Sequence, residues 1–189
     1  AGAYVATHCH PAEAVRRSAA LGVRTIEHGT LIDQPTAEFV AERGAYVVPT
    51  MATFFALLEK GAELGLPAPA QEKLKRIGDR AMAGLGIMRA AGVKMGLGTD
   101  LLGPLHVRQS SEFSLRAQAL PAAEILRSAC SINAELLGQS GRLGCIKPGA
   151  AADLLVVNGN PLHDIGLLAA GGKNLAMIMA AGQFHKRMP

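Results

Sequence analysis

Three residues with metal-binding side chains stand at the ends of short β-forming runs. His8, His28 and Asp100 are separated by 20 and 72 residues, a spacing that matches no local metal motif. Two imidazoles and one carboxylate are nevertheless a donor set that suits a divalent ion such as zinc. Because the carboxyl ends of the strands in a (β/α) barrel converge on one face, these side chains are expected to meet there.

Each of these residues also has a purely structural interpretation. A single His at a strand end is most often part of the packed structure, and an Asp after Gly-Thr commonly caps a helix. His10 could be a ligand, a substrate contact or part of a turn before Pro11, and Glu27 is expected to anchor a neighbouring loop. Three such residues on one predicted face shift the balance toward a metal site, and from these residues alone both interpretations stay open.

Other catalytic chemistries find little support. The sequence holds no Gly-x-Ser-x-Gly, no phosphate-binding loop and no glycine fingerprint after its first strand. Cys9 lies beside His8 and His10, and a neighbouring imidazolium lowers the pKa of a thiol. Because adjacent residues of a strand point to opposite faces, Cys9 and these histidines are not expected to converge.

The composition excludes several classes of protein. With 49% hydrophobic and 18% charged residues, the 189-residue chain is not disordered, and its apolar runs are too short to cross a bilayer. The net charge is +4, but the basic residues are dispersed and only 4% of the residues are aromatic, which argues against nucleic-acid binding. The three cysteines lack Cys-x-x-Cys spacing, so we expect reduced thiols and a cytoplasmic location, although an export signal could precede Ala1.

The first half of the chain alternates β-forming runs with helical patterns. The β runs lie at residues 3–7, 23–26, 45–48 and 93–97, and the helical patterns at residues 12–21, 36–42 and 51–91, the last interrupted at 65–69. Four βα units in succession predict a parallel sheet with right-handed crossovers. The three candidate ligands then follow the first, second and fourth strands.

The pattern changes after residue 141. Residues 109–139 are expected to be helical, whereas short β runs at 143–146, 152–157 and 175–180 are separated by Gly, Pro and Asn. Such runs predict a small antiparallel appendage instead of another βα unit. We therefore expect an α/β barrel part at residues 1–140 and a β part at residues 141–189.

Several segments in order along the chain carry a family resemblance. They are residues 5–10 (Val-Ala-Thr-His-Cys-His), 25–30 (Thr-Ile-Glu-His-Gly-Thr), 96–100 (Gly-Leu-Gly-Thr-Asp), 124–137, 144–149 and 152–162. Together they resemble the amidohydrolase superfamily, and within it the metal-dependent prolidase-like dipeptidases and carboxypeptidases. The resemblance covers essentially all of the chain and is more specific to the superfamily than to a substrate.

The resemblance implies a (β/α)8 TIM-type barrel joined to a small β-sandwich. This chain would supply the C-terminal half of the barrel, strands five to eight, and the C-terminal strands of the sandwich. His8 and His28 would be the metal-ligating histidines of strands five and six. Asp100 would be the strand-eight metal ligand and general base, and His10 would touch the substrate.

The chain departs from the family pattern in one large respect. The strand-one His-x-His pair and the carboxylated Lys of strand four, which complete a two-metal centre in the family, have no counterpart here. We therefore expect the chain to be part of a longer enzyme that binds two divalent metal ions. The expected metal is zinc. Alone, the chain is expected to be inactive and to pair with its missing N-terminal half or with itself, since half a barrel exposes strand edges.

The resemblance implies hydrolysis of a peptide or N-acyl amino acid bond, with a small peptide or N-acyl amino acid as substrate and no nucleic-acid or membrane partner. Two other functions stay open from the sequence. One is a mononuclear cyclic amidohydrolase or deaminase, such as an imidazolone hydrolase, which would hold one metal ion per full chain. The other is a metal-free βα scaffold that binds a partner, in which the histidines are structural.

Overall fold

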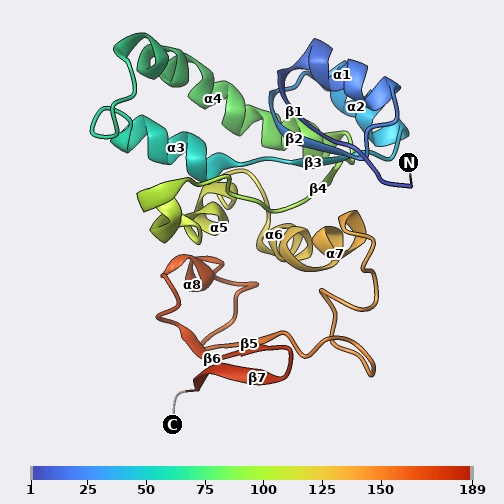
Figure 1. Cartoon of the computed structure of the whole chain (residues 1–189), viewed down its shortest axis with the longest axis vertical. Coiled ribbons are helices and arrows are strands. Elements are labelled where there is room, and N and C mark those ends of the chain that lie inside the picture. Colours follow the sequence, from blue (N-terminus) through green and yellow to red (C-terminus); the bar gives the residue numbers. More distant parts are fainter. Residues whose placement is uncertain (1, 188–189) are drawn as a thin grey trace.

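A parallel sheet forms one layer of the molecule, whose computed structural model describes residues 2–187 (Figure 1). Its strands β1 (Ala6–Pro11), β2 (Thr25–Leu31), β3 (Tyr46–Val48) and β4 (Lys94–Met95) follow one another in the order β1-β2-β3-β4. Each neighbouring pair is parallel. The predicted succession of four βα units is therefore confirmed.

The first two strands lie further along the chain than the sequence predicted. The β runs at 3–7 and 23–26 were expected to end before the histidines, but pairing continues through Cys9↔His28 to Pro11↔Leu31. Pairing with the neighbouring strand keeps these polar residues within the sheet despite their modest β propensity. The three histidines consequently lie near the C-terminal ends of the strands and not in loops: His8 and His10 on β1, and His28 on β2.

Three helices cover the outer face of the sheet: α1 (Ala12–Ala20), α2 (Gln34–Glu42) and α4 (Ala68–Ala90). The Asp33 carboxylate caps α2 by accepting the Thr36 N–H at 3.0 Å. The core between helices and sheet is built from aliphatic side chains with no exposed surface, namely Val15, Ile26, Val40, Val47 and Leu85. This core fixes the strands whose ends carry the polar residues.

A helical hairpin follows β3 and projects beyond the sheet (Figure 1). It comprises α3 (Met51–Lys60) and α4, and residues 61–67 connect the two helices. The predicted interruption at 65–69 is thus confirmed to within a few residues. Because α3 begins directly after β3, its position is tied to the end of the sheet.

Short helices link the sheet to the C-terminal region. They are a 3-10 turn (Gly103–Arg108), α5 (Ser111–Arg116), α6 (Ala122–Arg127), a π-helical turn (Ser128–Ile132) and α7 (Asn133–Leu136). An antiparallel sheet of β5 (Leu154–Val157), β6 (Leu175–Ala180) and β7 (Gln183–Arg187) follows, with α8 (Gly166–Ala169) between β5 and β6. The antiparallel appendage is confirmed, and it lies at the opposite end of the molecule from α1 (Figure 1).

One predicted strand is wrong and one was missed. Residues 143–146 form bends and turns, with a single bridge between Ser140 and Leu143, because Gly141 and Gly144 take left-handed conformations with φ of 80° and 65°. Strand β7 escaped prediction since its sequence is mostly polar. Within residues 2–187, no helix combines the length and the apolar character needed to cross a membrane.

Candidate metal centre

Three histidines gather at the carboxyl ends of β1 and β2. His8 and His10 are two residues apart on β1 and therefore share a face. One ring nitrogen from each of them and one from His28 lie within 4.8 Å of one another. The closest pair is His8 Nδ1 and His28 Nε2, at 2.8 Å. His8 is exposed on the edge strand, His10 is half-buried, and His28 is buried.

An unusual backbone conformation brings His28 into this cluster. Strict alternation along β2 would put His28 on the same face as Ile26, which is fully buried in the core. His28 instead has a φ of 75°, a left-handed conformation that L residues rarely adopt. This turn directs its ring toward His8. Asp100, which follows strand β4, is also left-handed, with a φ of 50°.

Threonine hydroxyls orient two of the imidazoles. His28 Nδ1 lies 2.7 Å from Thr50 Oγ1, and His10 Nδ1 lies 2.9 Å from Thr30 Oγ1. Both hydroxyls are buried, which keeps water from competing for these bonds. A fixed partner on one ring nitrogen is the usual arrangement around metal-binding histidines, because it leaves the other nitrogen directed at the ion.

Burial favours the neutral form of two of these imidazoles, His28 and His10. It lowers the pKa of His28 to about 4, and the charges of His10 and His8 act in the same direction. Burial also lowers the pKa of His10, with smaller contributions from His8 and Lys73 that Asp100 partly offsets. A neutral imidazole has a free lone pair, so the ring nitrogens are available as ligands near neutral pH.

A pocket of about 370 Å³ opens in front of the cluster. It is lined by His8, Glu27, His28, Val48, Thr50, Gly98, Thr99 and Asp100. Asp100 is exposed and faces this pocket, but its carboxylate is not one of the ligand atoms in the histidine cluster. The structure therefore brings His8 and His28 together as expected, adds His10, and leaves Asp100 across the same opening.

Glu27 is a pocket residue that the sequence analysis did not recognise as one. We expected it to anchor a neighbouring loop, yet its half-buried side chain lines the pocket. Burial raises the pKa of the Glu27 carboxyl, a hydrogen bond from Thr25 lowers it, and Asp100 raises it further. The signal lay in the strand register, because Glu27 is the direct neighbour of His8 across β1 and β2.

Cys9 lies on the other side of β1. Its side chain is 9% exposed, packs in the core and contacts Ser18 Oγ at 4.0 Å. Burial raises the pKa of this thiol, which disfavours the reactive thiolate. The expectation that Cys9 does not converge with the histidines is confirmed.

A buried ion pair supports the loop that carries Thr50. The Glu112 carboxylate accepts a hydrogen bond from Arg116 Nε at 2.6 Å and another from the Ala52 backbone N–H at 2.6 Å. Arg116 in turn donates to the Pro49 carbonyl. Neither side chain has exposed surface. The pair thus holds both sides of Thr50, and through Thr50 it fixes the ring of His28.

The low pKa of His28 predicts a pH effect on stability. Its folded pKa of about 4 lies below the value of about 6.5 for an unfolded chain, so between these pH values only the unfolded state binds the proton. The free energy of unfolding of the full-length, chelator-treated protein is expected to fall as pH drops through this window. Urea denaturation at several pH values measures it. A His28→Gln variant should show a smaller fall, and an equal fall in both proteins would contradict the assignment.

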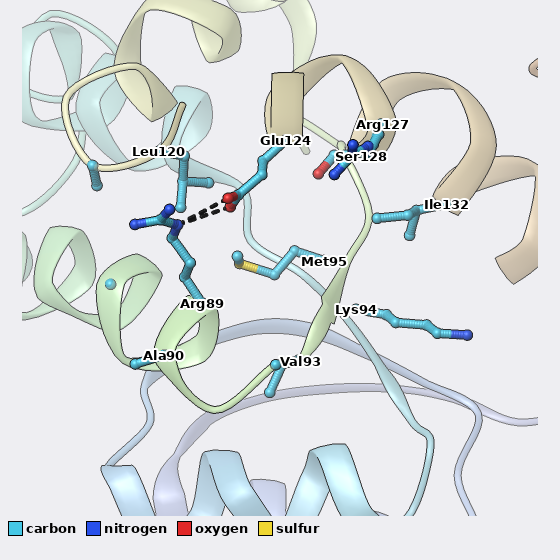
Figure 2. Close-up of a pocket in the computed structure, with 13 residues that line it drawn as sticks. Arg89, Ala90, Val93, Lys94, Met95, Leu120, Glu124, Arg127, Ser128 and Ile132 are labelled. Carbon is cyan, nitrogen blue, oxygen red and sulfur yellow. Dashed lines mark hydrogen bonds and ion pairs between the residues drawn. The ribbon is translucent and has the colours of Figure 1, made fainter. Parts of the chain in front are cut away.

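Another pocket, of about 500 Å³, lies beside β4 and is chemically different (Figure 2). Two of its charged side chains are hydrogen-bonded to each other: Arg89 Nε donates to both carboxylate oxygens of Glu124 at 3.0 Å. Among the residues that the structure describes, the one cluster of potential metal ligands is that of the three histidines. The candidate site is therefore the smaller pocket at the ends of β1 and β2.

Comparisons with known proteins show which proteins this chain is similar to. A prolidase crystallised with N-methylphosphonate-L-proline is 44% identical with a TM-score of 0.94, covering 98% of this chain and 45% of that one. A Xaa-Pro dipeptidase with methionine bound in its active site is 32% identical with a TM-score of 0.86, covering 98% and 45%. Ochratoxinase of Aspergillus niger is 26% identical over 163 residues, which is 85% of this chain and 34% of that protein.

The chain thus spans about a third of the length of the curated relatives and under half of the similar crystal structures. The amidohydrolase family matches residues 1–184, which is nearly the whole of the chain. The family match and the similarity of the α/β fold to the prolidase structure agree, and the chain belongs to the amidohydrolase family.

Proposed function

We propose that this chain is part of a metal-dependent hydrolase that cleaves the amide bond of a small peptide or an N-acyl amino acid. The observation that carries the proposal is the meeting of three imidazole nitrogens within 4.8 Å, beside the carboxylate of Asp100. Prolidase, Xaa-Pro dipeptidase and ochratoxinase relatives support amide hydrolysis. Xaa-Pro dipeptides are accordingly the first substrates to test.

The proposal extends to the architecture of the whole protein. Strands β1 to β4 would be strands five to eight of a (β/α)8 barrel within residues 1–140, and residues 141–189 would belong to a β-sandwich. The parallel order β1-β2-β3-β4 and the antiparallel sheet β5-β6-β7 support this division. Residue 1 and residues 188–189, the outer ends of these ranges, lie outside the described residues. The remaining strands would come from an N-terminal half or a second copy.

The donor set of the pocket fits a divalent metal ion. His8 and His28 offer imidazole nitrogens, and Asp100 offers a carboxylate on the same pocket. We assign these three residues as ligands and zinc as the metal, with the ligands of a second ion outside this chain. The metal, when bound, polarises the substrate carbonyl and lowers the pKa of the attacking water.

The side chains themselves supply the proton transfers and the orientation. Asp100 accepts the proton of the attacking water and returns it to the amine that leaves, as a general base and then a general acid. The His10 ring, held by Thr30 at 2.9 Å, contacts the substrate from the same face of β1. The hydroxyl of Thr50 fixes the ring of His28.

Chelation of the full-length protein tests this proposal. Xaa-Pro dipeptides and N-acyl amino acids should be hydrolysed, a chelator should abolish at least 90% of the rate (roughly tenfold or more), and added zinc should restore it. Elemental analysis should give two metal ions per full chain. One ion per chain with hydrolysis of a cyclic amide would favour the mononuclear alternative. A protein that binds no metal and keeps its stability in chelator would favour the scaffold alternative and contradict the proposal.

A further inference from the structure

A second pocket adjoins the histidine cluster and shares His10 with it. This pocket has a volume of about 380 Å³ and lies between the ends of β1 and β2 and the α3–α4 hairpin. Its walls are mostly aliphatic and aromatic, with Leu31 from β2, Phe54 from α3 and Ile77 from α4. A concave apolar site of this size suits a small ligand or one large apolar side chain.

A single cation stands among these apolar walls. Apart from His10, Lys73 is the one lining residue with a polar side chain, and it is exposed on α4. Among the described ion pairs, none involves Lys73, whereas Lys75, two residues further along α4, binds Glu72 Oε1 at 2.9 Å. An unpaired ammonium beside an apolar pocket favours a ligand that carries both a carboxylate and an apolar group.

We propose that this pocket binds the amino acid that the reaction releases as an amine: the apolar walls hold its side chain and Lys73 binds its α-carboxylate. The inference rests on the proposed function and names its substrate class. Only the released amino acid carries a carboxylate next to the scissile nitrogen, which is why a cation beside His10 selects that half of the substrate. The substrates are N-acyl or N-aminoacyl derivatives of large apolar amino acids such as leucine, methionine and phenylalanine.

Hydrolysis of a graded substrate series by the full-length protein tests the side-chain pocket. N-acetyl derivatives of glycine, alanine, leucine and phenylalanine should show kcat/KM rising by roughly tenfold to hundredfold from glycine to leucine and phenylalanine. Ala70 lines the pocket, so Ala70→Phe should fill it and lower kcat/KM for N-acetyl-leucine and N-acetyl-phenylalanine to about the value for N-acetylglycine. Ala68→Phe is the matched control, because Ala68 is exposed on the same helix and outside the pocket.

A second variant tests the carboxylate contact without entering the apolar walls. Lys73→Gln should raise KM for N-acetyl-leucine by roughly tenfold and leave kcat within about twofold, since a hydrogen bond to a charged group contributes about 1.5–3 kcal/mol. Lys75→Gln should change neither constant. Replacing the substrate carboxylate with an amide should weaken wild-type binding by the same factor, and should have no further effect in Lys73→Gln.

The possible results separate the two proposals. If no member of the series is hydrolysed, the proposed function is wrong and the pocket assignment fails with it. If all are hydrolysed at similar rates, or if Ala70→Phe and Lys73→Gln behave as their controls do, only the pocket assignment is wrong. Lys73 is exposed, so its variant remains informative even if Ala70→Phe does not fold.

Discussion

Asp100→Asn in the full-length protein is expected to lower kcat by roughly 10²-fold to 10⁴-fold, the range for loss of a positioned general base. Asn has nearly the same shape as Asp but cannot accept the proton of the attacking water. Asp100 lies across the pocket from His8 and His28, outside the histidine cluster, so these imidazoles remain as ligands in the variant. Steady-state kinetics and elemental analysis on the same sample give turnover and metal content together.

The control for this variant is Asp79→Asn, because Asp79 is exposed on α4 and does not line the pocket. It should retain wild-type turnover. If Asp100→Asn loses its metal along with its activity, the ligand role of Asp100 dominates over its role as a base. Near-normal turnover with the metal retained would remove Asp100 from the mechanism altogether.

Glu112→Gln is expected to lower the free energy of unfolding of the full-length protein by about 3–5 kcal/mol, the usual cost of leaving one charge of a buried ion pair without its partner. Both Glu112 and Arg116 are fully buried, so water cannot solvate the guanidinium that remains. The loss also loosens the backbone at Pro49 and Ala52, on either side of the threonine that orients His28. Urea denaturation followed by circular dichroism measures the change.

A matched pair on the surface provides the control. Glu13 and Arg17 have the same i,i+4 spacing at 3.2 Å, but their side chains are 86% and 73% exposed. Glu13→Gln should therefore change the free energy of unfolding by less than about 1 kcal/mol. A similar, small effect of both substitutions would mean that the Glu112–Arg116 pair does not hold the β3–α3 junction.

The order of the α/β elements was predictable from sequence because each strand is a short apolar run followed by an amphipathic helix. The helix that begins after Asp33 and the break between α3 and α4 were found in this way. Strand lengths were less predictable, since β1 and β2 continue through polar histidines. Pairing with the neighbouring strand, which no local pattern encodes, decides where these strands end.

The C-terminal region also shows that local sequence alone does not determine which segments become strands. The run at 143–146 is apolar enough to suggest a strand, but within residues 2–187 no partner strand lies beside it, and left-handed glycines interrupt it. Strand β7 is the reverse case, because a mostly polar segment becomes a strand by pairing with β6. In both cases the neighbour in space determined the structure.

The sequence predicted some residues of the candidate site but not its geometry. Placement at strand ends identified His8, His28 and Asp100, and the structure puts all three on one pocket. Nothing in the sequence indicated that a left-handed backbone would turn His28 away from the core, or that the hairpin would bring Lys73 beside His10. These features depend on contacts between segments far apart along the chain.

The left-handed residues of the pocket place thermal stability and the proposed activity in conflict. An L residue in this conformation costs about 1–2 kcal/mol, and both His28 and Asp100 adopt it. Glycine would relieve that cost at either position and would remove the side chain that the proposed function requires. Directed evolution that selects only for stability at high temperature would therefore favour glycine at these two positions and yield a stable protein without activity. Any such selection has to measure product formation at every round.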